Sequence, residues 1–334
     1  MRRLLFIAVS ILVSVGVLAL AVRNVPLADI GQRIATVEPL WIAVCLLMVV
    51  LGLWARAVRW QGLLGWRLSF WRTFHASNIM FMLNFLPLRL GEVARTALAA
   101  RYGVPFMTAA TSVLVERLID TVFVIIVLSF ALARAPQAPE LASQAAALFG
   151  IGAFVGFTIL IVFARFPAGA QRLLGWGEGH IPALRRLPLR RFLNDILVGL
   201  EPLTHWKRAL HVIVWSLIAW FFSFAGYYAA QRALQIQDID LILNALLSIS
   251  LIAFSIAIPV TIASVGPFQA AALAGGIALG LTETDALSLG VLYHVLTFIG
   301  YSTLGVMGLV ALGVSLGEVT RKAVPPQPAP GTQP

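Results

Sequence analysis

The sequence predicts an all-α, polytopic membrane protein, and three observations carry this prediction. The chain has 334 residues, of which 60% are hydrophobic and only 11% charged, whereas about a quarter of the residues of a soluble domain are charged. Its mean hydropathy is +0.92. Several apolar runs approach the length of about 20 residues with which a helix crosses about 30 Å of hydrocarbon. A water-soluble enzyme and a disordered chain are therefore excluded.

Six apolar runs are long enough to cross a bilayer as helices. They are residues 4–22, 40–58, 105–133, 144–164, 209–230 and 286–312. The first run follows Arg2 and Arg3 and resembles a signal peptide. Because it is longer than the apolar core of roughly 7–15 residues typical of such peptides, we expect it to be a retained helix.

Two further apolar stretches, residues 73–88 and 241–280, contain residues that interrupt helices. The first contains Asn78, Asn84 and Pro87, and the second contains Pro259, Ser264, Gly266 and Pro267. Proline removes a backbone donor and glycine loosens the helix. Irregular backbone at membrane depth is tolerated where protein or a water-filled cavity covers it. We predict two re-entrant or broken helical hairpins in addition to the six spans.

The distribution of basic residues predicts the orientation. With a cytoplasmic N-terminus, nineteen Arg and Lys residues fall on the inner side and four on the outer side, as the positive-inside rule requires. Both termini are then cytoplasmic, stretch 73–88 enters from inside, and stretch 241–280 enters from outside. Two broken elements entering from opposite faces are expected of an inverted repeat in a transporter. Two complete crossings within 241–280 are the alternative.

The chain divides into a transmembrane domain over residues 1–317 and a proline-rich tail over 318–334 that we expect to be disordered in the cytoplasm. Within the domain, residues 165–208 form a basic cytoplasmic loop. Its arginines alternate with leucines, which suits an amphipathic element on the anionic inner leaflet. The formal net charge of +10 therefore indicates contact with lipid headgroups, and no nucleic-acid partner is expected.

The most informative polar segment follows the first interruption. If a helix begins near Arg89, then Arg89, Glu92 and Arg95 share one face, where neighbouring pairs can form ion pairs. Two cations around one anion, beside Asn84 and a helix start, would attract a phosphate. The alternative is a cytoplasmic cap whose charges satisfy one another and face water.

A second cluster lies deep in the run 105–133. Glu116 and Asp120 share a helical face, and Arg117 is spaced to pair with Asp120. Charged groups at this depth face a bundle interior or a cavity. The cluster either forms a structural network, with Arg56 or Arg59 from the second span as a further partner, or contacts a substrate or a proton.

Other patterns have weaker implications. Arg56 and Arg59 precede Trp60 at the end of a span, a pattern typical of an interfacial anchor, with a headgroup contact as the alternative. His294 lies in the last span, as a hydrogen-bonded interior histidine or a proton carrier. The single cysteine, Cys45, cannot form an intrachain disulfide, and no metal site or cofactor is predicted. Nucleotide-binding and hydrolase motifs are absent from the sequence.

The polar pattern as a whole resembles a known family. Asn84…Pro87-x-Arg89-x-Gly91-Glu92-x-x-Arg95, followed by Glu116-Arg117-x-x-Asp120, is similar to the flippase-like membrane region of lysylphosphatidylglycerol synthases. The region from Pro259 through Ser264 to Gln269, together with His294, resembles a second signature of that family. The family often has glutamate where this chain has Gln269, and arginine in the last helix, so the departure weakens any carboxylate role there. The resemblance spans roughly residues 4–312.

The resemblance implies a bacterial inner-membrane protein that moves an anionic phospholipid or an isoprenoid-type lipid between leaflets. The synthases also carry an aminoacyl-transfer domain, which this sequence does not contain, and no catalytic residue is predicted. A scaffold of a lipid-biosynthesis complex and a membrane-embedded lipid-modifying enzyme are the alternatives. Membrane lipids are the expected partners, with a homo-oligomer or lipid-biosynthesis proteins as others. The candidate substrate-binding residues are Arg59, Asn84, Arg89, Glu92, Arg95, Glu116, Arg117, Asp120, Ser264, Gln269 and His294.

Overall fold

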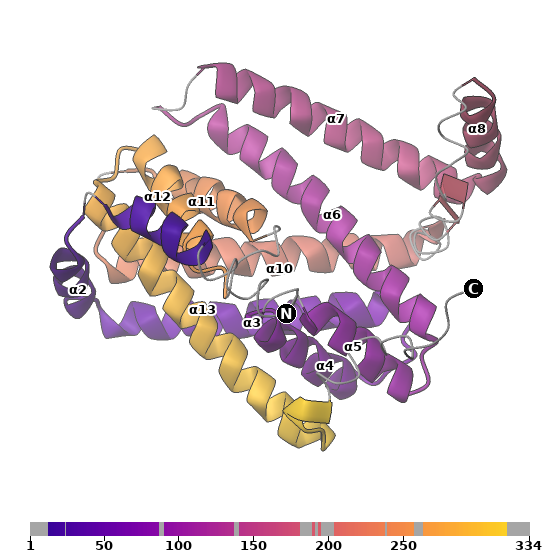
Figure 1. Ribbon diagram of the computed structural model, residues 1–334, viewed down its shortest axis with the longest axis horizontal. Helices are drawn as coiled ribbons and strands as arrows, with labels where there is room; N and C mark the ends of the chain where they lie inside the picture. The colour runs from indigo at the N-terminus through magenta and orange to yellow at the C-terminus, as the bar shows by residue number, and fades with distance from the viewer. Residues whose placement is uncertain are drawn as a thin grey trace, which may run out of the picture.

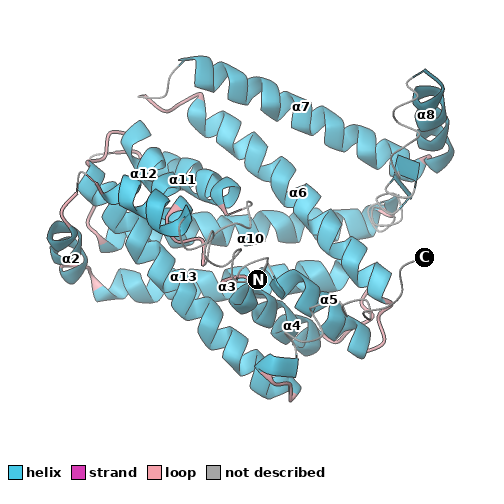
Figure 2. Cartoon of the chain, in the orientation of Figure 1, coloured by secondary structure: helices cyan, strands magenta, loops and turns pink. Residues whose placement is uncertain are grey.

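The regular elements of the computed structural model are helices throughout the part of the chain that it describes (Figure 2). The described residues are 13–23, 25–86, 90–136, 140–180, 189–190, 193–194, 204–237, 239–256 and 263–318. The fold is thus a helical membrane protein, as the composition predicts.

The chain forms long helices and shorter paired helices. A segment Val13–Val22 is followed by α2 (Leu27–Ala35), α3 (Pro39–Leu63), α4 (Phe70–Leu83), α5 (Leu90–Arg101), α6 (Phe106–Leu132), α7 (Glu140–Arg165), α8 (Pro167–His180), α10 (Trp206–Ala233), α11 (Leu241–Ser255), α12 (Pro267–Ala278) and α13 (Glu283–Leu312). Five of the six predicted spans match α3, α6, α7, α10 and α13 within a few residues. Only the second half of the first one lies among the described residues.

Fewer of these helices qualify as spans than the six that the apolar runs predict. By length and composition, α3, α10 and α13 could each cross a membrane, and two bent helix pairs raise the total to five. The pairs are Val13–Val22 with α2, bent by 78°, and Gly150–Phe163 with α8, bent by 113°. Helix α6 has a spanning length of 27 residues, but Glu116, Arg117 and Asp120 near its middle reduce its apolar character.

The main body consists of two four-helix units with the same order of elements, α3–α6 and α10–α13 (Figure 1). Each unit has a long helix, a hairpin of two short helices and a second long helix. Helices α3 and α10 pack antiparallel, since Glu38 N donates to Ala233 O at 3.0 Å at one end and His211 Nε2 lies 3.1 Å from Val58 O near the other. Across the units, α4 packs on α13 and α11 packs on α6. The two units thus have the same order of helices and pack against each other in an antiparallel manner.

Both predicted interruptions separate the two helices of a hairpin. Helices α11 and α12 have 15 and 12 residues, and at a rise of about 1.5 Å per residue each is shorter than about 30 Å of hydrocarbon. Their lengths therefore favour a broken hairpin over two complete crossings. The tips of the two hairpins meet, because Ala263 N donates to Phe85 O at 2.9 Å. Pro87 and Pro259 lie outside the described residues.

The remaining parts of the chain were predicted less completely. The basic loop 165–208 contains α8, and in it Arg190 pairs with Glu178 at 2.6 Å on an exposed surface. Most of its other residues between 181 and 203 lie outside the described part, as do residues 319–334 of the predicted tail. Helix α2 was not predicted, because its nine residues are too few for the span criterion and too polar for an apolar run.

Candidate functional site

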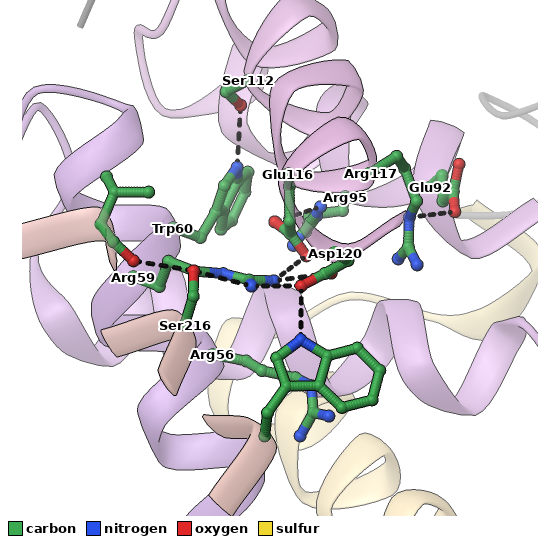
Figure 3. A network of polar contacts seen from close by, with 12 residues as sticks. Arg56, Arg59, Trp60, Glu92, Arg95, Ser112, Glu116, Arg117, Asp120 and Ser216 are labelled. Carbon is green, nitrogen blue, oxygen red and sulfur yellow. Dashed lines mark hydrogen bonds and ion pairs between the residues drawn. The ribbon is translucent and has the colours of Figure 1, made fainter. Parts of the chain in front are cut away.

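A network of buried ion pairs joins three helices at the centre of the first unit (Figure 3). Arg59 on α3 donates through Nη1 to Asp120 Oδ1 at 2.6 Å and lies 3.0 Å from Glu116 Oε1 through Nη2. Arg95 on α5 donates through Nη2 to Glu116 Oε2 at 3.0 Å. The side chains of Arg59, Arg95 and Glu116 are each 1% exposed. Glu116 thus neutralises part of two arginines from different helices.

The helical spacing on α6 explains why one face can hold both carboxylates. Glu116 and Asp120 are four residues apart and face the same neighbours. Asp120, 17% exposed, also accepts a hydrogen bond from Trp220 Nε1 on α10 at 3.0 Å. On the other side, the Arg95 guanidinium lies 4.3 Å from the ring centroid of Trp60. Trp220 and Trp60 thus contact the two ends of the ion-pair network and fix the positions of Asp120 and Arg95.

The ion-pair partners differ from those suggested by the spacing along the sequence. Arg95 pairs with Glu116 on α6, whereas the sequence pattern suggested Glu92 on its own helix. Arg117, which was predicted to pair with Asp120, lies 3.1 Å from Glu92 Oε1 through its Nε. The rotation of α5 against α6 directs Arg95 into the bundle and leaves Glu92 near the surface, so contacts between helices replace those along one helix. Arg89 lies outside the described residues.

A cavity with both charged and aromatic side chains on its wall lies beside this network, between the two units. Its larger part has a volume of about 290 Å³ and the adjoining part about 140 Å³. Asn84, Glu116, Arg117 and Asp120 line the larger part. The walls shared by both parts come from both units: Arg56, Phe85, Trp220, Ala253, Ile256, Ser264 and Tyr301. The cavity therefore lies where the hairpin tips meet.

The second unit contributes neutral polar groups on and next to the cavity wall. Gln269 Oε1 accepts a hydrogen bond from Gly266 N at 2.8 Å, and Gln269 Nε2 lies 2.9 Å from His294 Nδ1. Before Gly266, both Ala263 and Ser264 have left-handed backbone, with φ of 51° and 58°. Such backbone is costly for residues other than glycine and tends to occur at functional sites. Gln269 thus caps α12 directly beside a strained tip.

The predicted site residues divide into two groups. Asn84, Glu116, Arg117, Asp120, Ser264 and His294 line the cavity. The others do not line the cavity but form ion pairs or a hydrogen bond with residues that do: Arg59, Arg95, Glu92 and Gln269. Trp220 and Tyr301 also line the cavity and were not predicted there. Arg56, for which the sequence pattern indicates an interfacial anchor with a headgroup contact as the alternative, lines the cavity as well.

The described part of the chain has no group of three or more His, Cys, Asp and Glu side chains arranged to hold a metal ion. A family model described as the lysylphosphatidylglycerol synthase TM region matches residues 7–305. A search of curated proteins finds no match.

Proposed function

Because the chain belongs to the lysylphosphatidylglycerol synthase TM region family, we propose that it moves an anionic lipid between the two leaflets of the membrane. The family relates the protein to lipid metabolism or transport. The observation that carries the narrower proposal is the charged cavity between two antiparallel units. Charged side chains on such a cavity wall can contact a lipid headgroup while its acyl chains stay in hydrocarbon.

The cavity lowers the cost of moving the headgroup. A charge placed unaided at the bilayer centre costs several kcal/mol or more. In this protein, Arg117 and Asp120 provide hydrogen-bonding groups on the cavity wall, and Arg59 and Arg95 behind it are already neutralised. The network therefore holds its shape without requiring the lipid to pair with it.

Movement of the two units relative to each other would open the cavity to alternate leaflets. Many transporters with inverted repeats work by rocking of one repeat against the other around a site near the midplane. A backbone hydrogen bond between Ala263 and Phe85 joins the hairpin tips at this position. We propose that separation of the tips opens the path.

The proposal includes the setting of the protein. The excess of basic residues on one side supports cytoplasmic termini, and the family supports a bacterial inner membrane. An anionic phospholipid is the proposed partner, with an isoprenoid-type lipid as the second candidate. The cavity favours transport over a scaffold role, because a scaffold does not need a cavity. The engagement of Glu116 and Asp120 by arginines favours transport over lipid chemistry, which would use a free carboxylate.

The test is lipid movement in vesicles that contain the purified chain. Vesicles with fluorescent phosphatidylglycerol are treated with dithionite, which bleaches only the outer leaflet. We expect bleaching beyond one half with the protein and close to one half without it. Bleaching of only one half with well-folded protein would reject flipping of this lipid.

A cross-link between the hairpin tips tests the route. Phe85→Cys and Ala263→Cys are combined in a Cys45→Ala background, which removes the only native cysteine. Oxidation should stop lipid movement, and reduction should restore it. Each single-cysteine variant, treated with the same oxidant, is the control. Unchanged movement through a cross-linked protein would show that the tips do not gate the path.

A further inference from the structure

Arg56 on α3 differs from the other charged side chains of the cavity wall. Glu116 and Asp120 are paired with Arg59, and Arg117 is paired with Glu92. Among the described residues, no carboxylate forms an ion pair with Arg56, and no dashed line joins it to one in Figure 3. Arg56 lines both parts of the cavity. It is thus a cation with access to the cavity and without a protein counter-ion there.

The contacts of Arg56 hold it inside the protein. Its Nη2 donates to Ser223 Oγ on α10 at 2.8 Å. The guanidinium carbon lies 5.7 Å from the ring centroid of Phe81 and 6.0 Å from that of Trp220. Nη1 lies 3.0 Å from where a Cβ would stand at Gly52, one turn earlier on α3. The missing side chain at Gly52 leaves room for the guanidinium to fold back along its own helix.

The arginines near the cavity differ in their ion pairs. Arg59, Arg95 and Arg117 each pair with a carboxylate on α5 or α6, whereas Arg56 has no carboxylate partner among the described residues. Ionisable groups at membrane depth normally pair with one another or mark the route of a substrate or ion. Since Arg56 lines the cavity and has no carboxylate partner among the described residues, it is placed to pair with an anion that enters the cavity.

We propose that the cavity binds one phosphodiester monoanion of a lipid headgroup, with Arg56 as its direct contact. This inference rests on the proposed function and names the substrate class. A guanidinium offers planar paired donors that match two phosphate oxygens. One phosphodiester carries one negative charge, which matches the single positive charge of Arg56.

The size and the walls of the cavity suit a headgroup and not a whole lipid. A volume of about 290 Å³ has room for on the order of ten water molecules. Phe81, Phe85 and Tyr301 provide apolar surface beside Arg56, against which the glycerol carbons of a headgroup can pack. The acyl chains would have to remain outside, in the hydrocarbon.

The test is binding of soluble lipid analogues to the full-length chain in an uncharged detergent, measured by calorimetry. Dihexanoyl phosphatidylglycerol is the phosphodiester probe. Dihexanoyl phosphatidylcholine adds a compensating cation, farnesyl diphosphate carries the isoprenoid-type headgroup, and inorganic phosphate carries no lipid. We expect phosphatidylglycerol to bind more tightly than the other three.

The variants assign the site. Arg56→Gln should weaken phosphatidylglycerol binding about tenfold or more, because it removes charged hydrogen bonds. Arg56→Lys keeps the charge and should give an intermediate affinity. The matched control is Arg232→Gln, because Arg232 is also half-buried on a long helix and stacks on a tryptophan, Trp41, at 5.4 Å. Arg232 does not line the cavity, so Arg232→Gln should bind phosphatidylglycerol with the affinity of the wild type.

Each other outcome overturns part of the proposal. Wild-type affinity in Arg56→Gln, or an equal loss in Arg232→Gln, would remove Arg56 from the site. If farnesyl diphosphate bound more tightly than phosphatidylglycerol and this binding depended on Arg56, the ligand of the site would be a diphosphate and the phosphodiester would be rejected. Arg56-dependent binding without lipid movement in vesicles would reject the transport function and keep the site. Lipid movement that is unchanged in Arg56→Gln would reject the Arg56 site and keep the transport function.

Discussion

The two helical hairpins have the same architecture and different chemistry. Helices α4 and α5 have 14 and 12 residues, and α11 and α12 have 15 and 12. The first hairpin supplies Arg95 and Glu92 to ion pairs with α6. The second hairpin supplies Gln269, which bonds His294 on α13. The two units therefore share the backbone arrangement, and among the described residues only the first carries charged side chains on the cavity wall.

This difference assigns separate tasks to the two halves. In the second half, Asn244 donates to Gln231 at 2.9 Å and accepts from Ser248 at 2.9 Å. Neutral networks of this kind lose less solvation on burial than ions do. We infer that the first half recognises the headgroup and that the second half supplies a polar support of fixed shape. Four predictions test this division, from the largest expected effect to the smallest.

The largest effect is expected at Glu116, which holds both Arg59 and Arg95. Glu116→Gln leaves two buried guanidinium groups without their shared counter-ion. Loss of one partner from a buried ion pair destabilises by about 3–5 kcal/mol. We expect a much lower yield of folded protein and a large fall in the free energy of unfolding, measured in mixed micelles.

The matched control is Glu92→Gln, which makes the same chemical change in an ion pair nearer the surface. Glu92 and Arg117 are 23% and 34% exposed, so we expect a loss of about 1 kcal/mol or less. Equal effects of the two variants would show that Glu116 is hydrated, and the contrast between the two halves would lose its basis.

The second prediction concerns the close packing within the first hairpin. A Cβ at Gly91 on α5 would collide with the carbonyl oxygen of Met80 on α4 and with Asn84 Oδ1. Because the carbonyl is part of the α4 backbone, it cannot move aside easily. Gly91→Ala should destabilise by up to about 3 kcal/mol. In Gly152→Ala, the control on α7, the new Cβ meets nothing within 4 Å, so the thermal midpoint should not fall.

A smaller effect is expected in the neutral half. Gln269→Ala removes the acceptor for Gly266 N and the partner of His294. Loss of a cap and of neutral hydrogen bonds costs about 1–2 kcal/mol. The free energy of unfolding should therefore fall less than in Glu116→Gln. A loss as large as that of Glu116→Gln would mean that the second hairpin is as critical as the first.

The sequence determined much of this fold in advance, for identifiable reasons. Apolar runs located the long helices, and the proline and glycine interruptions located both hairpins. Basic residues flank 73–88 and acidic residues flank 241–280, which predicts that the two hairpins enter the membrane from opposite faces. Helix α2 escaped prediction because short, partly polar helices do not produce a long apolar run.

The ion pairs between helices could not be predicted from the sequence. Spacing within one helix identified Glu116 with Asp120 correctly as neighbours, but it could not show that Arg95 reaches Glu116, since that depends on how α5 is rotated against α6. Arg56 and Arg59 have the same residue type and the same anchor pattern in the sequence. Only the positions of the carboxylates on α6 distinguish Arg59, which is paired, from Arg56, which is not.

The smallest effect is expected at Arg33, whose ion pair lies at the edge of the second half. Arg33 on α2 contacts Asp285, in the first turn of α13, at 2.6 Å, and the two side chains are 32% and 26% exposed. Partly exposed pairs of this kind contribute about 0–1 kcal/mol, because water and salt screen the attraction. Arg33→Gln should therefore leave lipid movement unchanged and lower the thermal midpoint slightly, and high salt should reduce even that difference. Since Asp285 still accepts a hydrogen bond from Thr282 Oγ1 at 2.9 Å, its carboxylate is not left without a donor. A large loss of stability or of lipid movement in Arg33→Gln would place an essential charge in the second half, and the division of tasks between the two hairpins would then be wrong.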